Sequence, residues 1–303
     1  MFSVIIPLYN KEKSISSAIQ SVLSQNFNNF ELIIVNDGST DTSRQKAGRF
    51  SDSRIQIIDQ KNMGVSAARN RGIQAASNPY IAFLDGDDLW EPEYLQTQKE
   101  LIRDYPEAGL WGCGVGKLSC NVKVPFYHGV PSEHRGLIKN YFTMEKSGML
   151  FRPSGTVIHK DVFNKVGLLD ERIHFGEDLD ILYRVLFEFQ PAFYNKNVAY
   201  YRTDAENNAT RKPKPIEKRF FYYIKKFEKE RAQNTDFRKY FDQLTLAFMY
   251  EHRLKNNSRD VVDNILEEID FSLQKSWWKM VYAFPALYKL YRRYIKAQWR
   301  YKF

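Results

Sequence analysis

Two acidic clusters hold the residues of this sequence that are best suited to do chemistry. The first, Asp-Gly-Asp-Asp at residues 85–88, follows the apolar run 80–84. Gly86 lets the chain bend without a Cβ clash, so the neighbouring aspartates can face one point. Mg²⁺ and Mn²⁺ prefer such oxygen ligands and share their coordination shell with water and substrate phosphates. The cluster predicts a metal and phosphate site, although on this string alone a polar surface turn is an equal alternative.

The second cluster is Glu177 and Asp178 at the start of a predicted helix, residues 177–189. Acidic residues in a first helical turn are favoured by the helix dipole, so ordinary capping explains them when they are taken alone. The functional interpretation is that one carboxylate projects into a cleft as a general base and deprotonates an attacking hydroxyl.

Three further residues could bind a nucleotide. Tyr9 offers a stacking face, Asp37 could accept a hydrogen bond from a base N–H, and Arg69 could meet a phosphate or nucleobase near a helix N-terminus. The alternatives to nucleotide binding are that Tyr9 lies at the rim of the site, that Asp37 is a turn residue and that Arg69 is a solvated side chain.

The elements that must position these residues follow a βαβ pattern. Alternating apolar runs and amphipathic stretches predict strands at 3–8, 31–35, 54–59 and 80–84 and helices at 12–25, 39–50 and 65–75. This alternation predicts a parallel sheet covered on both faces. Such sheets bind ligands beyond the carboxyl ends of their strands, where Tyr9, Asp37 and Asp85 would lie.

The rest of the chain is less regular. We expect a helix at 92–104, a glycine-rich strand at 110–117 and the helix at 177–189, followed by a helical pattern throughout from residue 215. The prolines at 213 and 215 place a domain boundary near 211–215.

Composition limits the class of protein. The chain has 303 residues, a formal charge of +9 and 43% apolar residues, which excludes a disordered chain. Its two cysteines cannot form a disulfide framework or a zinc site by themselves. The first residues indicate a strand rather than a signal peptide, and no apolar run is long enough to span a membrane. We therefore expect a cytoplasmic protein.

The positive charge is concentrated in the last third of the chain. Residues 211–303 carry a net charge of +11 and the remainder −2. Beyond Pro285, basic residues fall on one helical face opposite aromatic and aliphatic ones, a pattern typical of a helix at an anionic membrane surface. The alternative is a helix that packs on the body or on a second subunit, giving a homo-oligomer. The basic residues are Lys289, Arg292, Arg293, Lys296 and Arg300.

The motifs occur together and in order, and they resemble those of the family 2 glycosyltransferases. They lie at residues 3–10, 35–41, 62–72, 84–88 and 176–178. The resemblance implies a GT-A fold, which is α/β with a mixed, mostly parallel central sheet, and here a helical C-terminal extension. It also implies an inverting, metal-dependent transfer from a nucleotide-sugar, usually a UDP-sugar. We expect a catalytic domain at 1–210, with a nucleotide-sugar half (1–100) and an acceptor half (101–210), followed by the extension at 211–303.

The resemblance also implies roles for individual residues. The nucleotide-sugar would be held near the strand ends, the divalent cation (Mn²⁺ or Mg²⁺) at the Asp-x-Asp motif, and the acceptor hydroxyl at the catalytic base. By position, the nucleotide-sugar would contact Pro7, Tyr9, Asp37, Arg69 and Asp85; the metal would bind Asp87, Asp85 and Asp88; Asp178 would be the base; and Glu177 would bind or position the acceptor.

Two departures from the family pattern refine this expectation. The Gln-x-x-Arg-Trp motif of processive members is missing after Asp178, which favours the addition of a single sugar. Thr203 and Asp204 follow Tyr201-Arg202, where many relatives carry a histidine that could be a further metal ligand.

A glycan or a lipid-linked glycan of a bacterial surface polysaccharide would be the acceptor, and the enzyme would sit peripherally at the inner face of the cytoplasmic membrane. The competing hypotheses are an inactive glycosyltransferase-like scaffold and a nucleic-acid-binding protein that uses the basic aromatic tail. The neutral body and its clustered aspartates would repel phosphate chains, so we expect no nucleic acid partner.

Overall fold

The computed structural model describes residues 1–126, 128–144, 150–207, 215–253, 259–276, 278 and 282. The chain divides into two compact units. The first contains Met1–Lys139 and Gly148–Pro213, and the second contains Asn140–Ser147 and Lys214–Phe303. The functional division at 1–100, 101–210 and 211–303 stays a prediction.

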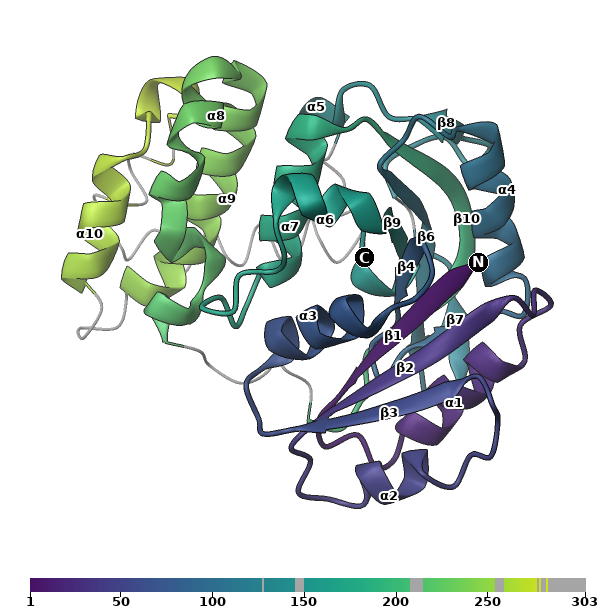
Figure 1. Ribbon diagram of the computed structural model, residues 1–303. Helices are drawn as coiled ribbons and strands as arrows, with labels where there is room; N and C mark the ends of the chain where they lie inside the picture. The colour runs from purple at the N-terminus through teal and green to yellow at the C-terminus, as the bar shows by residue number, and fades with distance from the viewer. Residues whose placement is uncertain are drawn as a thin grey trace. The chain divides into compact units, whose positions relative to one another are not determined.

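The first unit is built on a ten-stranded sheet with the order β3-β2-β1-β4-β9-β6-β10-β5, to which β7 and β8 add at β6 and β10 (Figure 1). Strands β1 to β4 are mutually parallel, as are β6 and β10, whereas β9 runs antiparallel between β4 and β6. The predicted mixed, mostly parallel sheet is therefore confirmed. The strands are β1 (Phe2–Leu8), β2 (Phe30–Asp37), β3 (Ile55–Gln60), β4 (Tyr80–Phe83), β5 (Leu89–Trp90), β6 (Leu110–Ser119), β7 (Val122–Val124), β8 (Arg135–Leu137), β9 (Thr156–His159) and β10 (Pro191–Arg202).

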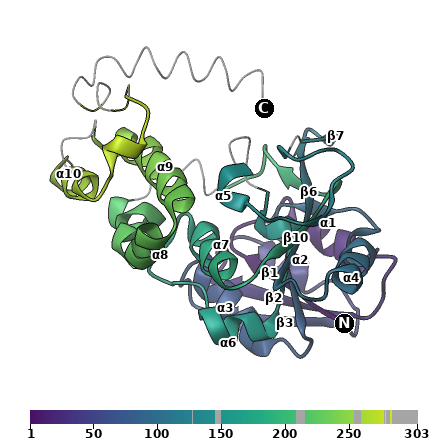
Figure 2. The ribbon, with the colours of Figure 1, turned by 90° about the horizontal axis from the view of Figure 1, so that it is seen from above.

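Helices cover both faces of this sheet. Figures 1 and 2 show α1 and α4 on one face and α3, α6 and α7 on the other. In strand β1, Val4, Ile6 and Leu8 join the core on the α1 side, and Ile5 faces α3, as the alternation of a strand requires. The helices are α1 (Ile15–Leu23), α2 (Ser43–Ala47), α3 (Val65–Ala75), α4 (Tyr94–Asp104), α6 (Lys160–Val166) and α7 (Glu177–Glu188), with a 3₁₀ turn at Pro153–Gly155.

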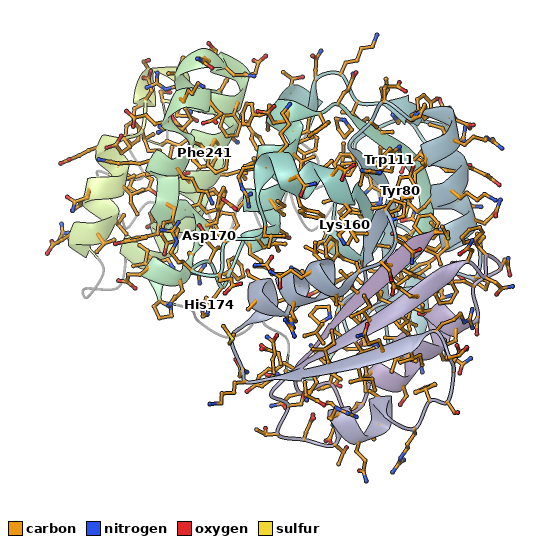
Figure 3. All side chains as sticks on the ribbon, in the orientation of Figure 1. Tyr80, Trp111, Lys160, Asp170, His174 and Phe241 are labelled. Carbon is orange, nitrogen blue, oxygen red and sulfur yellow. The ribbon has the colours of Figure 1, made fainter. Side chains whose placement is uncertain are left out.

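Close packing fixes the helix that carries Arg69 on the sheet. A Cβ atom on Gly72 would lie 2.5 Å from Ile5 Cγ2, so only glycine lets α3 approach β1 this closely. On the next part of the sheet, the rings of Tyr80 on β4 and Trp111 on β6 meet edge to face with centroids 5.7 Å apart (Figure 3). The first contact joins α3 to β1, and the second joins β4 to β6.

Two predicted helices are shorter than expected. The helix expected at 12–25 begins at Ile15, and the helix expected at 39–50 comprises only Ser43–Ala47. Near the start of both helices, side chains accept hydrogen bonds from backbone N–H groups and hold the preceding residues in loops. Ser43 Oγ accepts a hydrogen bond from Lys11 N, and Asp41 accepts one from Glu12 N and one from Ser43 N. The two loops are thereby tied to each other at the ends of β1 and β2.

The second unit is helical in the part that the structure describes, as predicted. Its core is aromatic, with the rings of Phe227, Phe237 and Phe241 in mutual contact at 5.2–5.9 Å between centroids. A buried ion pair joins Arg231 to Asp242 at 2.8 Å. The elements are α5 (Tyr141–Met144), two 3₁₀ segments (Ile216–Lys218 and Phe220–Phe227), α8 (Glu228–Gln233), α9 (Thr235–Arg253), α10 (Arg259–Glu267) and a 3₁₀ turn at Phe271–Leu273.

The amphipathic C-terminal segment lies outside the described residues. Lys289, Arg292, Arg293, Lys296 and Arg300 all belong to it, so their expected roles stay predictions. Across the described residues, every helix is too short or too polar to traverse a lipid bilayer.

Candidate active site

The predicted site residues gather where the parallel strands end. Leu8 on β1 pairs with Asn36 on β2, and Ile5 on β1 pairs with Phe83 on β4. The chain therefore leaves β1, β2 and β4 at one edge of the sheet. Open α/β sheets bind ligands at this edge.

Arg69 joins the two acidic clusters. Its Nη2 lies 2.7 Å from Asp85 Oδ1, and its Nη1 lies 2.9 Å from Glu177 Oε1. The arginine side chain is only 4% exposed. Burial lowers the pKa of Arg69, but the facing charges of Asp85 and Glu177 outweigh it and leave the pKa raised. Side chains 108 residues apart in the sequence thus meet in one ion-pair network.

Asp178 lies at the start of α7, beside this network. Gly176, with φ +81°, turns the chain into the helix and brings Glu177 and Asp178 into its first turn. Among the described residues, the one hydrogen bond donated to the Asp178 carboxylate comes from Leu179 N at 3.0 Å. Burial, followed by repulsion from Glu177, raises the pKa of Asp178 to about 7, against the opposing attraction of Arg69. A carboxylate with this pKa can accept a proton near neutral pH.

Asp87 is held by a lysine that the sequence analysis did not single out. Lys11 Nζ forms an ion pair with Asp87 Oδ2 and also donates a hydrogen bond to the Glu206 carbonyl at 3.1 Å. Burial raises the pKa of Asp87, and repulsion from Asp85 adds to the rise, although Lys11 opposes it. One ammonium therefore offsets only part of the negative charge in this turn.

Asp88 is buried, and both of its carboxylate oxygens accept hydrogen bonds. Its Oδ2 accepts a hydrogen bond from Ser154 Oγ at 2.5 Å, and its Oδ1 accepts one from Arg202 N at 3.0 Å. Burial raises its pKa well above the ordinary value, and the charges of Asp87 and Asp85 add to this. Asp88 thus joins the turn to the 3₁₀ segment and to the end of β10, and its role as a metal ligand stays a prediction.

The donor set of the turn suits a hard divalent cation. Asp85 and Asp87 offer carboxylate oxygens, and the pKa of Asp87 is raised first by burial and then by the charge of Asp85, both of which a bound cation would offset. Within the described residues, however, no three His, Cys, Asp or Glu side chains are arranged to hold a metal ion together. Two carboxylates fit a cation whose remaining ligands are water and substrate phosphate oxygens.

The predicted nucleotide residues lie at the same edge but differ in their contacts. Tyr9 is 38% exposed, so its ring is accessible for stacking, and the preceding Pro7 is half-buried. Asp37 is buried, and its carboxylate accepts hydrogen bonds from Gln60 Nε2, Met63 N and Gly64 N at 2.8–2.9 Å. Asp37 therefore holds the loop that leads into α3, and its contact with a base stays a prediction.

Several residues that support the site were missed from the sequence. Besides Lys11 and Ser154, Glu206 Oε1 accepts hydrogen bonds from Lys13 N, Ser14 N and Ser14 Oγ, at 2.9–3.1 Å. Asn70 holds the segment before α7 by exchanging hydrogen bonds with Leu169. Only Asn70 lay inside a recognised motif. The partners of the others are 66 to 195 residues away, so no local signal marks them.

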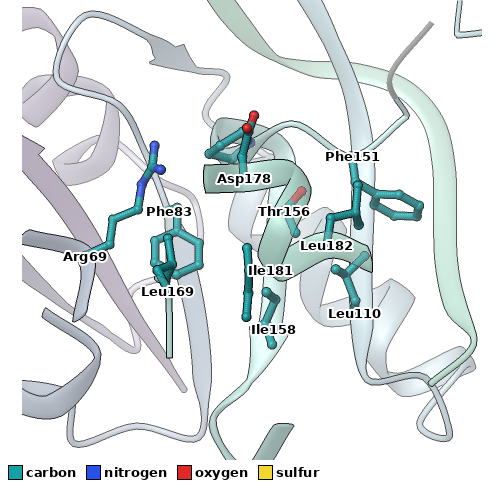
Figure 4. Close-up of a pocket in the computed structure, with 11 residues that line it drawn as sticks. Arg69, Phe83, Leu110, Phe151, Thr156, Ile158, Leu169, Asp178, Ile181 and Leu182 are labelled. Atoms are coloured by element: carbon teal, nitrogen blue, oxygen red, sulfur yellow. The ribbon is translucent and has the colours of Figure 1, made fainter. Parts of the chain in front are cut away.

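A pocket opens beside Asp178 between α7 and the sheet. Figure 4 shows Arg69 and Asp178 along one end, with aliphatic and aromatic side chains making up most of the lining. Its volume is about 40 Å³. The apolar lining keeps water from one side of Asp178, in keeping with the raised pKa of that carboxyl.

The fold is that of the GT-A glycosyltransferases. The structure is similar to the crystal structure of residues 1–349 of S. aureus TarS in complex with UDP-GlcNAc, with a TM-score of 0.70. The likeness covers 90% of this chain and 82% of that one, at 16% sequence identity. The expected fold class is confirmed.

The sequence comparisons assign the chain to a family within this fold class. Residues 3–167 match the model of glycosyl transferase family 2, so the chain belongs to this family. It is 32% identical over 214 residues to EpsH of Bacillus subtilis (strain 168), which is named as a glycosyltransferase, and this match covers 66% of this chain and 58% of EpsH.

A second relative is the UDP-Glc:α-D-GlcNAc-diphosphoundecaprenol β-1,3-glucosyltransferase WfgD of Escherichia coli. It is 43% identical over 103 residues, which is 34% of this chain and 41% of WfgD. In both matches the chain covers less than two thirds of the relative.

Proposed function

We propose that this protein transfers one sugar from a UDP-sugar to a hydroxyl of a glycan or lipid-linked glycan, with inversion at the anomeric carbon and with the aid of a divalent cation. The observation that carries the proposal is the pairing of Arg69 with both Asp85 and Glu177. Because of it, the donor motif after β4 and the acceptor motif on α7 share one location.

The donor would bind along the edge of the sheet. Tyr9 stacks on the base, Pro7 shapes the floor beneath it, and Asp37 with Arg69 borders the nucleotide. Asp85 faces the ribose and the sugar. A divalent cation held by Asp85 and Asp87, with Asp88 behind them, would act as a Lewis acid on the phosphate oxygens of the leaving diphosphate.

The acceptor reacts on the side of Asp178. An Asp178 carboxylate oxygen takes the proton of the acceptor hydroxyl as that oxygen forms a bond to the anomeric carbon. The bond from the anomeric carbon to the diphosphate oxygen breaks, and the nucleoside diphosphate leaves with the electron pair. A single displacement inverts the centre, so one base suffices where a glycosidase needs two carboxylates. Glu177 positions the acceptor and, with Arg69, the base.

The first experiment is a panel of nucleotide-sugars with and without Mn²⁺ or Mg²⁺. Thermal stabilisation and slow donor hydrolysis identify the donor without knowledge of the acceptor. We expect one UDP-sugar to stabilise the protein, only when the cation is present. Stabilisation that is equal with and without a cation would contradict the metal requirement, and no response to any nucleotide would contradict the donor assignment.

A lipid-linked acceptor suits the basic C-terminal segment. WfgD is named for an acceptor on diphosphoundecaprenol. We place this enzyme on the inner face of the cytoplasmic membrane in surface-polysaccharide synthesis, with an anionic lipid surface against the basic face defined above. Vesicles with anionic lipid should retain the full chain in a salt-sensitive manner. Changing Lys289, Arg292, Arg293, Lys296 and Arg300 to glutamine should release it, and unchanged retention would favour packing against a second subunit.

A further inference from the structure

The pocket beside Asp178 is not used by the transfer step. Its walls come from β4, β6, β9, α7 and the segments before β9 and before α7. Apart from Arg69 and Asp178 at its end, it is lined by Phe83, Leu110, Phe151, Pro153, Thr156, Ile158, Leu169, Ile181 and Leu182 (Figure 4).

The lining admits only an apolar group. The hydroxyl of Thr156 already donates a hydrogen bond to the Arg152 carbonyl at 2.7 Å. The Arg69 guanidinium is engaged by Asp85 and Glu177. A hydroxyl or amine placed deep in this pocket would therefore lose its bonds to water without replacement, which is unfavourable.

The size of the pocket sets an upper limit on its ligand. A cavity of roughly 10–15 Å³ already holds one water-sized group, so about 40 Å³ holds a very few non-hydrogen atoms. A sugar ring or an isoprenoid chain does not fit, whereas a methyl group with the atom that bears it does.

The position of Asp178 indicates which molecule brings this group. A general base must lie about 2.6–3.2 Å from the hydroxyl that it deprotonates. A substituent on the carbon beside that hydroxyl would then be near the end of the pocket that Arg69 and Asp178 line. The anomeric carbon of the donor must lie on the far side of the attacking oxygen from the base, so the acceptor is the nearer molecule.

We propose that this pocket receives a methyl group that the acceptor sugar carries near its attacking hydroxyl. The methyl belongs either to an acetamido group or to a 6-deoxy sugar, and in both cases it makes the pocket the determinant of acceptor choice. This inference rests on the proposed function, because it takes Asp178 to be the base.

Saturation-transfer NMR on the full chain with UDP and the diamagnetic cation Mg²⁺ tests this directly. The probes are N-acetylglucosamine, 6-deoxyglucose, glucosamine and glucose. We expect the strongest transfer at the methyl of one of the first two sugars, and which of the two responds identifies the source of the methyl. The two sugars without a methyl should bind roughly tenfold more weakly, the lower end of what a hydrophobic pocket discriminates.

Variants of α7 separate the pocket from the rest of the site. Leu182→Phe fills the pocket and should remove the methyl signal and the preference. Leu186→Phe, one turn further along α7 and not in the lining, is the matched control and should keep both. Leu182→Ala enlarges the pocket and should extend binding to N-propionylglucosamine, so the test stands even if the phenylalanine variant does not fold.

Three results would overturn the proposal: ring protons saturated as strongly as the methyl, a methyl signal that survives Leu182→Phe, or no binding of either methyl sugar to protein that binds UDP. The last would make the pocket a packing void only. UDP binding and donor hydrolysis are measured on the same samples. Their loss would count against the proposed function instead, whereas their presence without a methyl preference counts against the pocket alone.

Discussion

The two acidic clusters differ in how their charge is supported. Polar partners surround the turn after β4: Lys11 pairs with Asp87, while Ser154 and Arg202 donate hydrogen bonds to Asp88. At the start of α7, by contrast, Asp178 has an apolar pocket on one side and accepts a single hydrogen bond from the described residues. The first environment orients its carboxylates through polar partners, as a cation site needs, whereas the second leaves one carboxylate with few partners, as a base that must meet a substrate hydroxyl needs. The predictions below test this division of roles, from the largest expected effect to the smallest.

Asp178→Asn should have the largest effect, because it removes the proton acceptor and leaves the shape intact. We expect kcat to fall by about 10²–10⁴-fold, the range of general base catalysis. UDP binding in the presence of Mn²⁺ should be nearly unchanged when it is measured by calorimetry. A variant that keeps the wild-type kcat would remove Asp178 from the mechanism.

Arg69→Met should destabilise both clusters together. It leaves Asp85 and Glu177 without their shared cation, and breaking a buried ion pair costs about 3–5 kcal/mol of the free energy of unfolding. Urea denaturation measures this loss. Arg71→Met, on the solvent side of the same helix, is the control and should change stability by less than about 0.5 kcal/mol. Equal losses of the free energy of unfolding in the two variants would show that the ion pairs of Arg69 do not stabilise the fold.

Asp87→Asn should affect the cation rather than the proton. We expect UDP binding in Mn²⁺ to weaken by about 10- to 100-fold, the usual scale of changes around a metal site. Binding without metal should change little. If the two conditions respond alike, Asp87 does not act through a cation.

The pH profile should follow the carboxyl of Asp178. Its pKa of about 7 means that the base is ionised above this value, so kcat/KM should rise about tenfold per pH unit below 7 and level off above it. Glu177→Gln removes a charge that raises this pKa and should shift the rise to lower pH. A shift to higher pH, or none, would contradict the assigned electrostatics.

The same pKa has a consequence for stability. Because the pKa of Asp178 is raised on folding, the native state binds its proton more tightly than the unfolded state does. Its contribution to stability is therefore present at low pH and is lost as the pH rises from about 4 towards 7. Asp178→Asn should flatten this part of the stability curve in calorimetric scans, and an unaltered slope would indicate an ordinary pKa.

Glu206→Ala should have the smallest effect. It removes the acceptor of hydrogen bonds from the Lys13 and Ser14 backbone at the start of α1, a change of about 1 kcal/mol for a helix cap. Thermal unfolding should register this loss, whereas the pH profile should not move. A moved profile would connect the segment after β10 to the base.

Much of the donor side could be predicted because its signals are local. The strands at residues 3–8, 31–35 and 80–84 are apolar runs followed at once by polar residues, and the ends of all three lie within two residues of those of the observed strands. Parallel pairing then brings Tyr9, Asp37 and Asp85 to one edge. The partner of Asp87 could not be predicted, because nothing around Lys11 distinguishes it from the other lysines of this basic chain.

The acceptor side was harder to predict, because its strands form by pairing with strands that are distant in the sequence. Strand β9 has only four residues and pairs antiparallel with both β4 and β6, and β10 carries three polar residues, 195–197, at an irregular register. Their hydrophobic pattern is too short or too interrupted to indicate strands. The pocket beside Asp178 is lined by residues between 69 and 182, so it exists only once these elements have packed.

The order and type of residues alone determined the family, the sheet and the identity of the acidic groups, since each depends on neighbours along the chain. Only the tertiary structure decided that Arg69 joins Asp85 to Glu177, that Lys11 pairs with Asp87, and that Asp178 lies against an apolar pocket. The charges near a side chain and the extent of its burial depend on distances between residues that only folding brings together. For that reason, the sequence identified the carboxylates, and the fold determined which partners each of them meets.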